Sequence, residues 1–107
     1  MATTVEVHVR LPSEGHDLVR ALAVRGLIGT LGADGPGAVV TIDCHREDLE
    51  HLLADLLPAL DDWRADSGLS ALDVRVLGHR YALRGHGDIA RCLTDLRDAS
   101  PVPPVAA

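Results

Sequence analysis

Two histidines and an aspartate are the residues best suited to metal or proton-transfer chemistry. His8 lies in an alternating segment, residues 5–11, and Asp43 and His45 lie two apart in a second strand-like segment. Because side chains two apart in a strand share a face, pairing of these segments would bring the three together, with Glu6 nearby. Imidazoles and carboxylates bind divalent metals, and histidine titrates near neutral pH. The alternative is a solvated polar face, since the spacing matches no known metal motif.

The two cysteines give no sign of nucleophilic catalysis. Cys44 precedes His45 directly, but neighbouring side chains of a strand point to opposite faces, so the pair cannot act as nucleophile and base. We expect Cys44 to be a small core residue, and both Cys44 and Cys92 to be reduced thiols. A disulfide between them is the alternative.

Four glycines recur every three residues, at Gly26, Gly29, Gly32 and Gly35. A phosphate-binding loop needs its glycines between a strand and the start of a helix, so that backbone amides face the anion. Here the glycines follow a helical pattern and lead into a hairpin. They are interpreted as turn and edge-strand glycines.

A local group of basic side chains surrounds the single tyrosine, Tyr81. It consists of His79, Arg80, Arg84 and His86. Guanidinium groups bind carboxylates and phosphates, so this is where an anionic ligand or an acidic partner would dock. A solvated strand end is the alternative, since charged loop residues are usually exposed.

The turn after the first predicted strand suggests a ligand site. Residues 11–18, Leu-Pro-Ser-Glu-Gly-His-Asp-Leu, resemble the strand-to-helix turn of ACT-type amino-acid-sensing domains. The likeness covers only this turn and the order of the elements, and the usual Asp-x-Pro-Gly pattern is absent. It implies a small-ligand site formed by Pro12, Ser13, Gly15, His16 and Asp17.

Composition limits the functions that fit. The 107 residues suit one domain, and the net charge of −6 opposes binding to nucleic acid. No apolar stretch is long enough to span a bilayer and no signal peptide is evident, so we expect a cytoplasmic protein without membrane contact. Lys, Asn and Phe, whose codons are AT-rich, are all absent, which indicates a GC-rich bacterial genome. No motif calls for a cofactor.

Periodicity predicts four strands and three helices. The strands are expected at residues 5–11, 27–31, 38–44 and 72–76, with a bulge at Gly78 before Tyr81 and Leu83. Helices are expected at residues 16–25, from Arg46 to a stop at Ser67-Gly68, and from Asp88 onward. Pro58 should kink or split the second helix. Residues 1–98 form one domain, and residues 99–107 a Pro-rich, disordered tail.

The order strand, helix, strand, strand, helix, strand predicts an α+β, ferredoxin-like two-layer sandwich. Its antiparallel sheet would have the order 4-1-3-2, with a short extra C-terminal helix. Both main helices would then cover one face and leave the other bare. The bare face would present Glu6, His8, Arg10, Thr41, Asp43 and Arg75, with Arg10 close enough to Asp73 to pair.

Three functional hypotheses follow. The first is a non-catalytic interaction or regulatory module that binds a second copy or a protein partner through the bare sheet face or the edge strand. The second is a sensor of a small ligand, an amino acid or nucleotide, at residues 12–17. The third is a metal- or histidine-dependent enzyme built on His8, Asp43 and His45. The lack of a nucleophile–base pair favours the first.

Overall fold

The computed structural model describes residues 2–98, which form a five-stranded antiparallel sheet and three α-helices. In chain order the elements are β1 (Ala2–Val9), α1 (Pro12–Val24), β2 (Thr30–Asp34), β3 (Gly37–His45), a 3-10 turn (Arg46–Asp48), α2 (Leu49–Asp66), β4 (Leu72–Val76), β5 (His79–Leu83) and α3 (His86–Asp98). The α+β class is confirmed. The tail expected at residues 99–107 lies outside the described residues.

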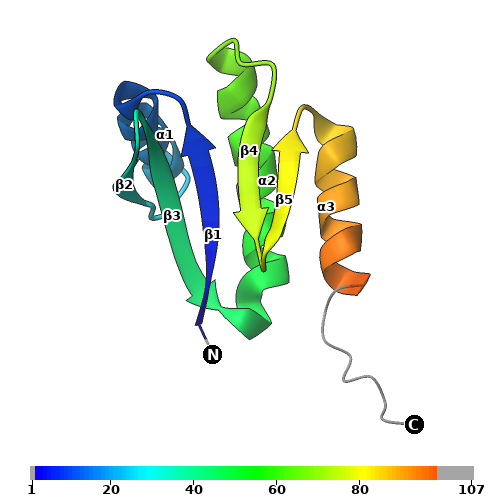
Figure 1. Cartoon of the computed structure of the whole chain (residues 1–107). Helices are drawn as coiled ribbons and strands as arrows, with labels where there is room; N and C mark the ends of the chain where they lie inside the picture. Colours follow the sequence, from blue (N-terminus) through cyan, green and yellow to red (C-terminus); the bar gives the residue numbers. More distant parts are fainter. Residues whose placement is uncertain (1, 99–107) are drawn as a thin grey trace, which may run out of the picture.

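The sheet has the order β2-β3-β1-β4-β5, with every neighbouring pair antiparallel. Strand β1 lies at the centre of the sheet, between β3 and β4. The alternating segment that begins at Val5 therefore pairs with the strands expected at residues 38–44 and 72–76. Helices α1 and α2 lie behind the sheet in Figure 1, and α3 stands beside β5. The opposite face, toward the viewer, carries no helix.

The fifth strand corrects the expected four-stranded order. The sequence predicts a bulge at Gly78, but the chain reverses there in a two-residue hairpin. Both Leu77 (φ 51°) and Gly78 (φ 78°) have positive φ values, as a type I′ turn requires. The usual sequence signal for this turn is Asn-Gly, and a leucine in the first position hid it.

The core lies between the sheet and the helices. Alternate residues of β1 are sealed, with Val5 and Val7 at 0% exposure and Val9 at 7%. Leu11, expected on the same buried face, is 53% exposed because β1 ends at Val9 and Leu11 is the N-cap of α1. Helix α2 contributes the largest set of buried side chains: Leu49, Leu53, Leu56, Leu57, Leu60 and Trp63.

Helix α1 begins four residues earlier than expected. Pro12 occupies its first turn, where the missing N–H breaks no helical bond, and the Glu14 carboxylate accepts a hydrogen bond from the Leu11 amide at 3.2 Å. Gly15 is therefore a buried helical residue. A Cβ atom at Gly15 would lie 2.5 Å from Leu31 Cδ1 and 3.0 Å from Ala38 Cβ. This glycine allows α1 to approach β2 and β3 closely.

Two other predicted boundaries change. Strand β2 covers Thr30–Asp34 rather than 27–31, because Leu27 belongs to the end of α1. The Leu27 amide donates a hydrogen bond to the Leu22 carbonyl at 3.0 Å, and the preceding Gly26 has the left-handed conformation that ends a helix. Pro58 does not split the second helix, since α2 is continuous from Leu49 to Asp66. Among the helices of residues 2–98, none has the length and apolar character needed to cross a membrane.

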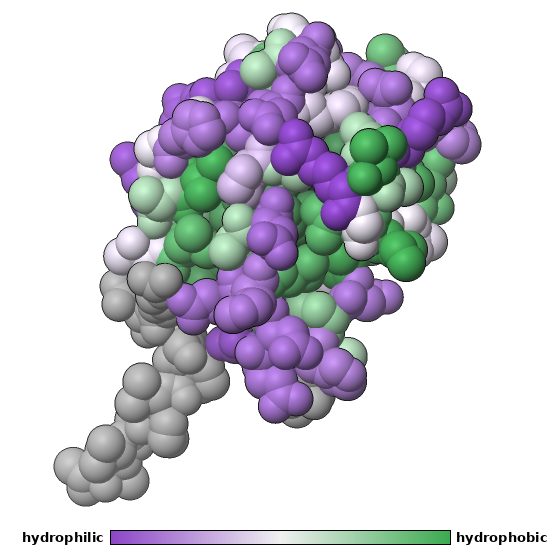
Figure 2. All heavy atoms as spheres, turned by 180° about the vertical axis from the view of Figure 1, so that it is seen from behind, coloured by the Kyte–Doolittle hydropathy of each residue, from purple (hydrophilic) through white to green (hydrophobic). Residues whose placement is uncertain are grey.

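From behind, the helical side shows a band of hydrophilic side chains with hydrophobic ones visible on either side of it (Figure 2). The most exposed large apolar residues are Val24 (84%) and Ile28 (83%), at the end of α1 and just before β2. The helical face is therefore the solvated outer layer of the sandwich.

Candidate functional site

The bare sheet face presents rows of side chains across the strands, of which the first is polar and the second is mixed. The strand register aligns one row across all five strands: Thr30, Thr41, Glu6, Arg75 and Arg80. A second row contains Gly32, Val39, His8, Asp73 and Ala82. Of the side chains expected on this face, Glu6, His8, Thr41, Asp43 and Arg75 share it. Arg10 does not, because it lies beyond the end of β1.

Asp73 is the centre of the basic half of this face. Its carboxylate lies 3.2 Å from Arg75 Nη2 and 3.1 Å from Arg80 Nη2, with a further bond to Arg80 Nε at 3.3 Å. Burial by itself raises the pKa of Asp73, but the hydrogen bonds and charges of the two arginines outweigh it and lower the pKa below its ordinary value. The group therefore stays ionised and holds both guanidinium groups in place.

The acidic half lies on β1 and β3. His8 Nε2 is 2.9 Å from Glu6 Oε1, and Thr4 Oγ1 donates to Asp43 Oδ1 at 2.7 Å. The His8 side chain is only 14% exposed although no helix covers it. Next to this half, Arg75 Nε is buried and has no hydrogen-bond partner in the described residues. The face thus carries negative charge on one side and positive charge on the other.

The proposed metal and proton-transfer cluster is not assembled. His8 is opposite Val39, whereas Asp43 is opposite Thr4 and His45 is opposite Ala2. His8 and Asp43 are therefore separated by four strand positions, roughly 14 Å along the sheet. Within residues 2–98, no group of three or more His, Cys, Asp or Glu side chains is placed to hold a metal ion.

The expected pair between Arg10 and Asp73 is also wrong. Arg10 Nη2 instead lies 3.6 Å from Glu14 Oε2, at the start of α1. The strand register places His8 opposite Asp73. Both errors have one source, since the period-two pattern fixes the face of each residue but not which residues are opposite each other.

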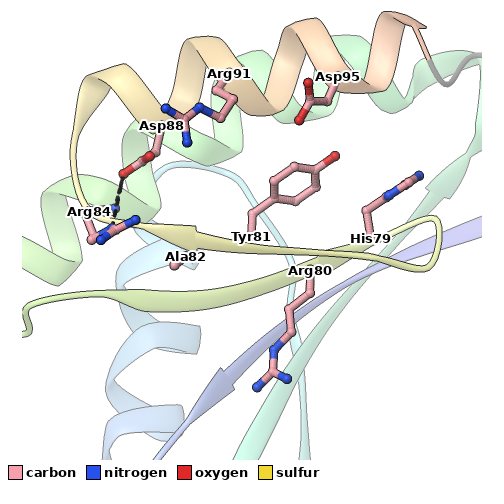
Figure 3. Close-up of a pocket in the computed structure, with 8 residues that line it drawn as sticks. All are labelled: His79, Arg80, Tyr81, Ala82, Arg84, Asp88, Arg91 and Asp95. Carbon is pink, nitrogen blue, oxygen red and sulfur yellow. Dashed lines mark hydrogen bonds and ion pairs between the residues drawn. The ribbon is translucent and has the colours of Figure 1, made fainter.

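A second surface feature is a cleft of about 580 Å³ between β5 and α3. Figure 3 shows His79 and Tyr81 pointing from β5 toward α3, and Arg91 and Asp95 reaching toward the cleft from the helix. Arg80 points to the opposite side of the strand, where it pairs with Asp73. Arg80 nevertheless borders the cleft, so His79, Arg80 and Arg84 of the expected basic group all lie along it. His86, also expected here, does not line the cleft.

Charges in the cleft are separated along its length. Arg84, Asp88 and Arg91 lie at one end, and Asp95 and His79 at the other (Figure 3). Asp88 Oδ2 accepts the Arg84 amide at 2.9 Å, while the Arg84 guanidinium lies 3.9 Å from it. Among the side chains that the structure describes, those of His79, Arg91 and Asp95 form no hydrogen bond or ion pair that holds them in place.

Tyr81 occupies the middle of the cleft. Its ring centroid is 6.3 Å from that of His79, with an interplanar angle of 41°. Burial, and then the charges of Cys92 and Asp95, raise the pKa of the Tyr81 phenol, so its hydroxyl stays protonated and can donate a hydrogen bond. Sequence reasoning missed Arg91 and Asp95, although their spacing by four residues on a helix places them on one face.

The residues of the expected ligand turn are spread over the first turns of α1. Pro12, Ser13 and His16 are exposed, Gly15 is buried, and the Asp17 carboxylate accepts a hydrogen bond from Trp63 Nε1 at 3.1 Å. A hollow of about 320 Å³ lies nearby, but Arg10 and Glu14 line it rather than these five residues. The structure therefore does not bring the five together around one space.

Both cysteines are free thiols: Cys92 is buried in the core, whereas Cys44, expected there too, is only half-buried against it. Burial, and then the charge of Asp95, raise the pKa of Cys92 to about 11. Burial raises the pKa of Cys44 as well, assisted by the nearby charges of Asp48 and Asp43. Since the thiolate is the reactive form, neither residue is poised as a nucleophile.

No family model matches the chain, and neither a curated protein nor a solved structure matches it significantly.

Proposed function

We propose that this protein is a non-catalytic interaction module that associates with a second copy of itself through the bare sheet face. The observation that carries the proposal is the division of charge on this face. Glu6 and Asp43 lie on β1 and β3, and Arg75 and Arg80 on β4 and β5.

A two-fold axis that runs along the strands between β1 and β4 would place Glu6 of one copy over Arg75 of the other, and Thr41 over Arg80. Such an interface is self-complementary, as a symmetric dimer requires. Complementary charge of this kind favours correct pairing and fast encounter more than high affinity. The face is roughly 20 Å wide and 17 Å long, which fits a small, transient interface.

The side chains that would meet the partner are already held in place. Asp73 fixes Arg75 and Arg80, so ordering these long side chains on association costs little further entropy. A hollow of about 200 Å³ beside Glu6, Arg75 and Arg80 offers room for a partner side chain. These features support a docking role, and none of them implies a catalytic reaction.

Sedimentation velocity over a range of protein concentrations tests the proposal. We expect the sedimentation coefficient to rise with concentration. Arg75→Glu should weaken association by about tenfold, because it reverses a charge in the interface. Glu6→Arg should act in the same way. The double variant should restore association, because it exchanges the two opposite charges of Glu6 and Arg75, which are cross-strand neighbours within one copy.

The matched control is Arg20→Glu, which makes the same change in net charge on the exposed side of α1. It should leave association within about twofold of the original protein. Equal weakening by Arg20→Glu and Arg75→Glu would contradict the proposal. So would a sedimentation coefficient that stays monomeric up to millimolar concentration.

A further inference from the structure

The cleft between β5 and α3 has features that the docking role does not use. It lies at the far edge of the molecule from β2, and its lining side chains His79, Tyr81, Arg91 and Asp95 point away from the bare face (Figure 3). On the bare face the charged side chains are largely engaged with one another. In the cleft, several polar side chains converge without such engagement in the described residues.

From this contrast we propose that the cleft binds a small planar organic anion, a ring that carries a carboxylate or phosphate group. The anionic group would lie at the end formed by Arg84 and Arg91. The ring would lie against Tyr81.

The charge distribution sets the direction of such a ligand. Two guanidinium groups and the Asp88 carboxylate lie at one end, so this end carries a net positive charge. Asp88 accepts the Arg84 amide at 2.9 Å and lies 3.9 Å from the Arg84 guanidinium. Arginine forms paired hydrogen bonds to carboxylates and phosphates. The Asp95 carboxylate, at the other end, repels an anion. The cleft therefore accepts an oxyanion in one orientation only.

The middle of the cleft favours a flat group. Tyr81 is partly buried, and its ring lies between β5 and α3 with the His79 ring tilted beside it. Aromatic rings in offset or tilted contact gain stabilisation beyond the area they bury. The volume of about 580 Å³ lies in the range of small-molecule sites.

The chain provides a selective probe for this site. Tyr81 is the only tyrosine, and the only tryptophan, Trp63, is buried elsewhere against Asp17. Ring signals of ¹³C-labelled tyrosine therefore report on the cleft alone, and the Trp63 indole signal is an internal control. Benzoate and phenyl phosphate are the probes, because together they separate a carboxylate ligand from a phosphate ligand.

We expect at least one of these anions to shift the Tyr81 ring signals to saturation, with the Trp63 signal unchanged. Arg84→Gln and Arg91→Gln should each weaken binding about fivefold or more, because each removes one charged hydrogen-bond donor. The matched control is Arg20→Gln, on the exposed side of α1 and outside the cleft, and it should change the affinity less than twofold.

Three results would overturn the proposal: no shift with either anion when it is raised from 20-fold the protein concentration to its solubility limit; equal effects of Arg20→Gln and Arg91→Gln; or inorganic phosphate binding as tightly as phenyl phosphate. The last result would show that the ring makes no contribution. None of the three bears on self-association, which uses a different surface and a different measurement.

Discussion

Arg80 Nη2 lies 3.1 Å from Asp73 Oδ2, across the hairpin that joins β4 and β5. The pair lies on one side of β5, and the side chains that point toward α3 lie on the other. Arg80 belongs to the bare sheet face, whereas its neighbour Tyr81 faces α3 (Figure 3). One short strand therefore contributes to the proposed docking face on one side and to the proposed ligand cleft on the other.

The ion pairs of Asp73 predict a pH-dependent contribution to stability. Because the pKa of Asp73 is lowered in the folded state, its stabilising effect is present above the unfolded pKa and is lost as the pH falls through the lower, folded pKa. Asp73→Asn should lower the free energy of unfolding by roughly 0.5 kcal/mol at pH 7. Urea denaturation followed by circular dichroism measures the difference, which should begin to shrink as the pH falls to the ordinary value of 3.8 and disappear below the folded pKa. A difference that persists there would point to lost packing instead.

The single tyrosine permits a direct titration of the cleft. Burial, with the nearby Asp95 charge, should hold the pKa of Tyr81 above its usual value of 10.0. Ultraviolet absorbance of the phenolate measures it, and Asp95→Asn should move the midpoint part of the way back. Since the folded pKa is the higher one, stability should fall as the pH rises through it. A midpoint at the ordinary value in the folded protein would mean that Tyr81 is solvated.

Gly37 should tolerate no side chain. A Cβ atom there would lie 2.3 Å from the Val9 carbonyl oxygen and 3.2 Å from that of Arg10, and backbone atoms cannot move aside as a side chain can. Gly37→Ala should therefore lower the free energy of unfolding by about 2 kcal/mol. Gly87→Ala is the control, because Gly87 is in α3 with open space around it, and alanine there should be neutral or stabilising by up to about 1 kcal/mol. Equal losses for both variants would refute the close approach of β3 to the end of β1.

The hydrogen bond between Trp63 and Asp17 joins α2 to α1. Asp17→Ala should cost about 1 kcal/mol, because it leaves the indole N–H, on a side chain only 6% exposed, without its acceptor. Circular dichroism measures the loss, and the fluorescence of Trp63 should change with it. Asp17→Asn keeps an acceptor oxygen and should recover most of the stability. If alanine at this position has no effect, the contact does not hold the helices together.

The sequence was most informative where side-chain period alone decides structure. In the predicted strands at residues 5–11 and 72–76, the alternating apolar residues Val5, Val7, Leu72 and Val74 are indeed buried, as period two requires. Register is a different quantity, since it depends on where the turns fall. That is why His8 was expected beside Asp43 and is found opposite Val39.

Local backbone exceptions account for the missed strand and the shifted helix. Leu77 adopts φ 51°, which few leucines do, so no turn residue marked the hairpin before Gly78. Pro12 and Gly15 are typical turn residues, yet here one begins a helix and the other allows close packing. The cleft was only partly foreseen, because Arg91 and Asp95 meet Tyr81 through the packing of α3 on β5.

Self-association through the bare face is tested most directly by amide chemical shifts measured while the protein is diluted. The predicted result is a set of concentration-dependent shifts confined to β1, β3, β4 and β5, largest around Glu6, Thr41 and Arg75. Shifts confined to the helices or to β2, or spectra that do not change with concentration, would contradict it.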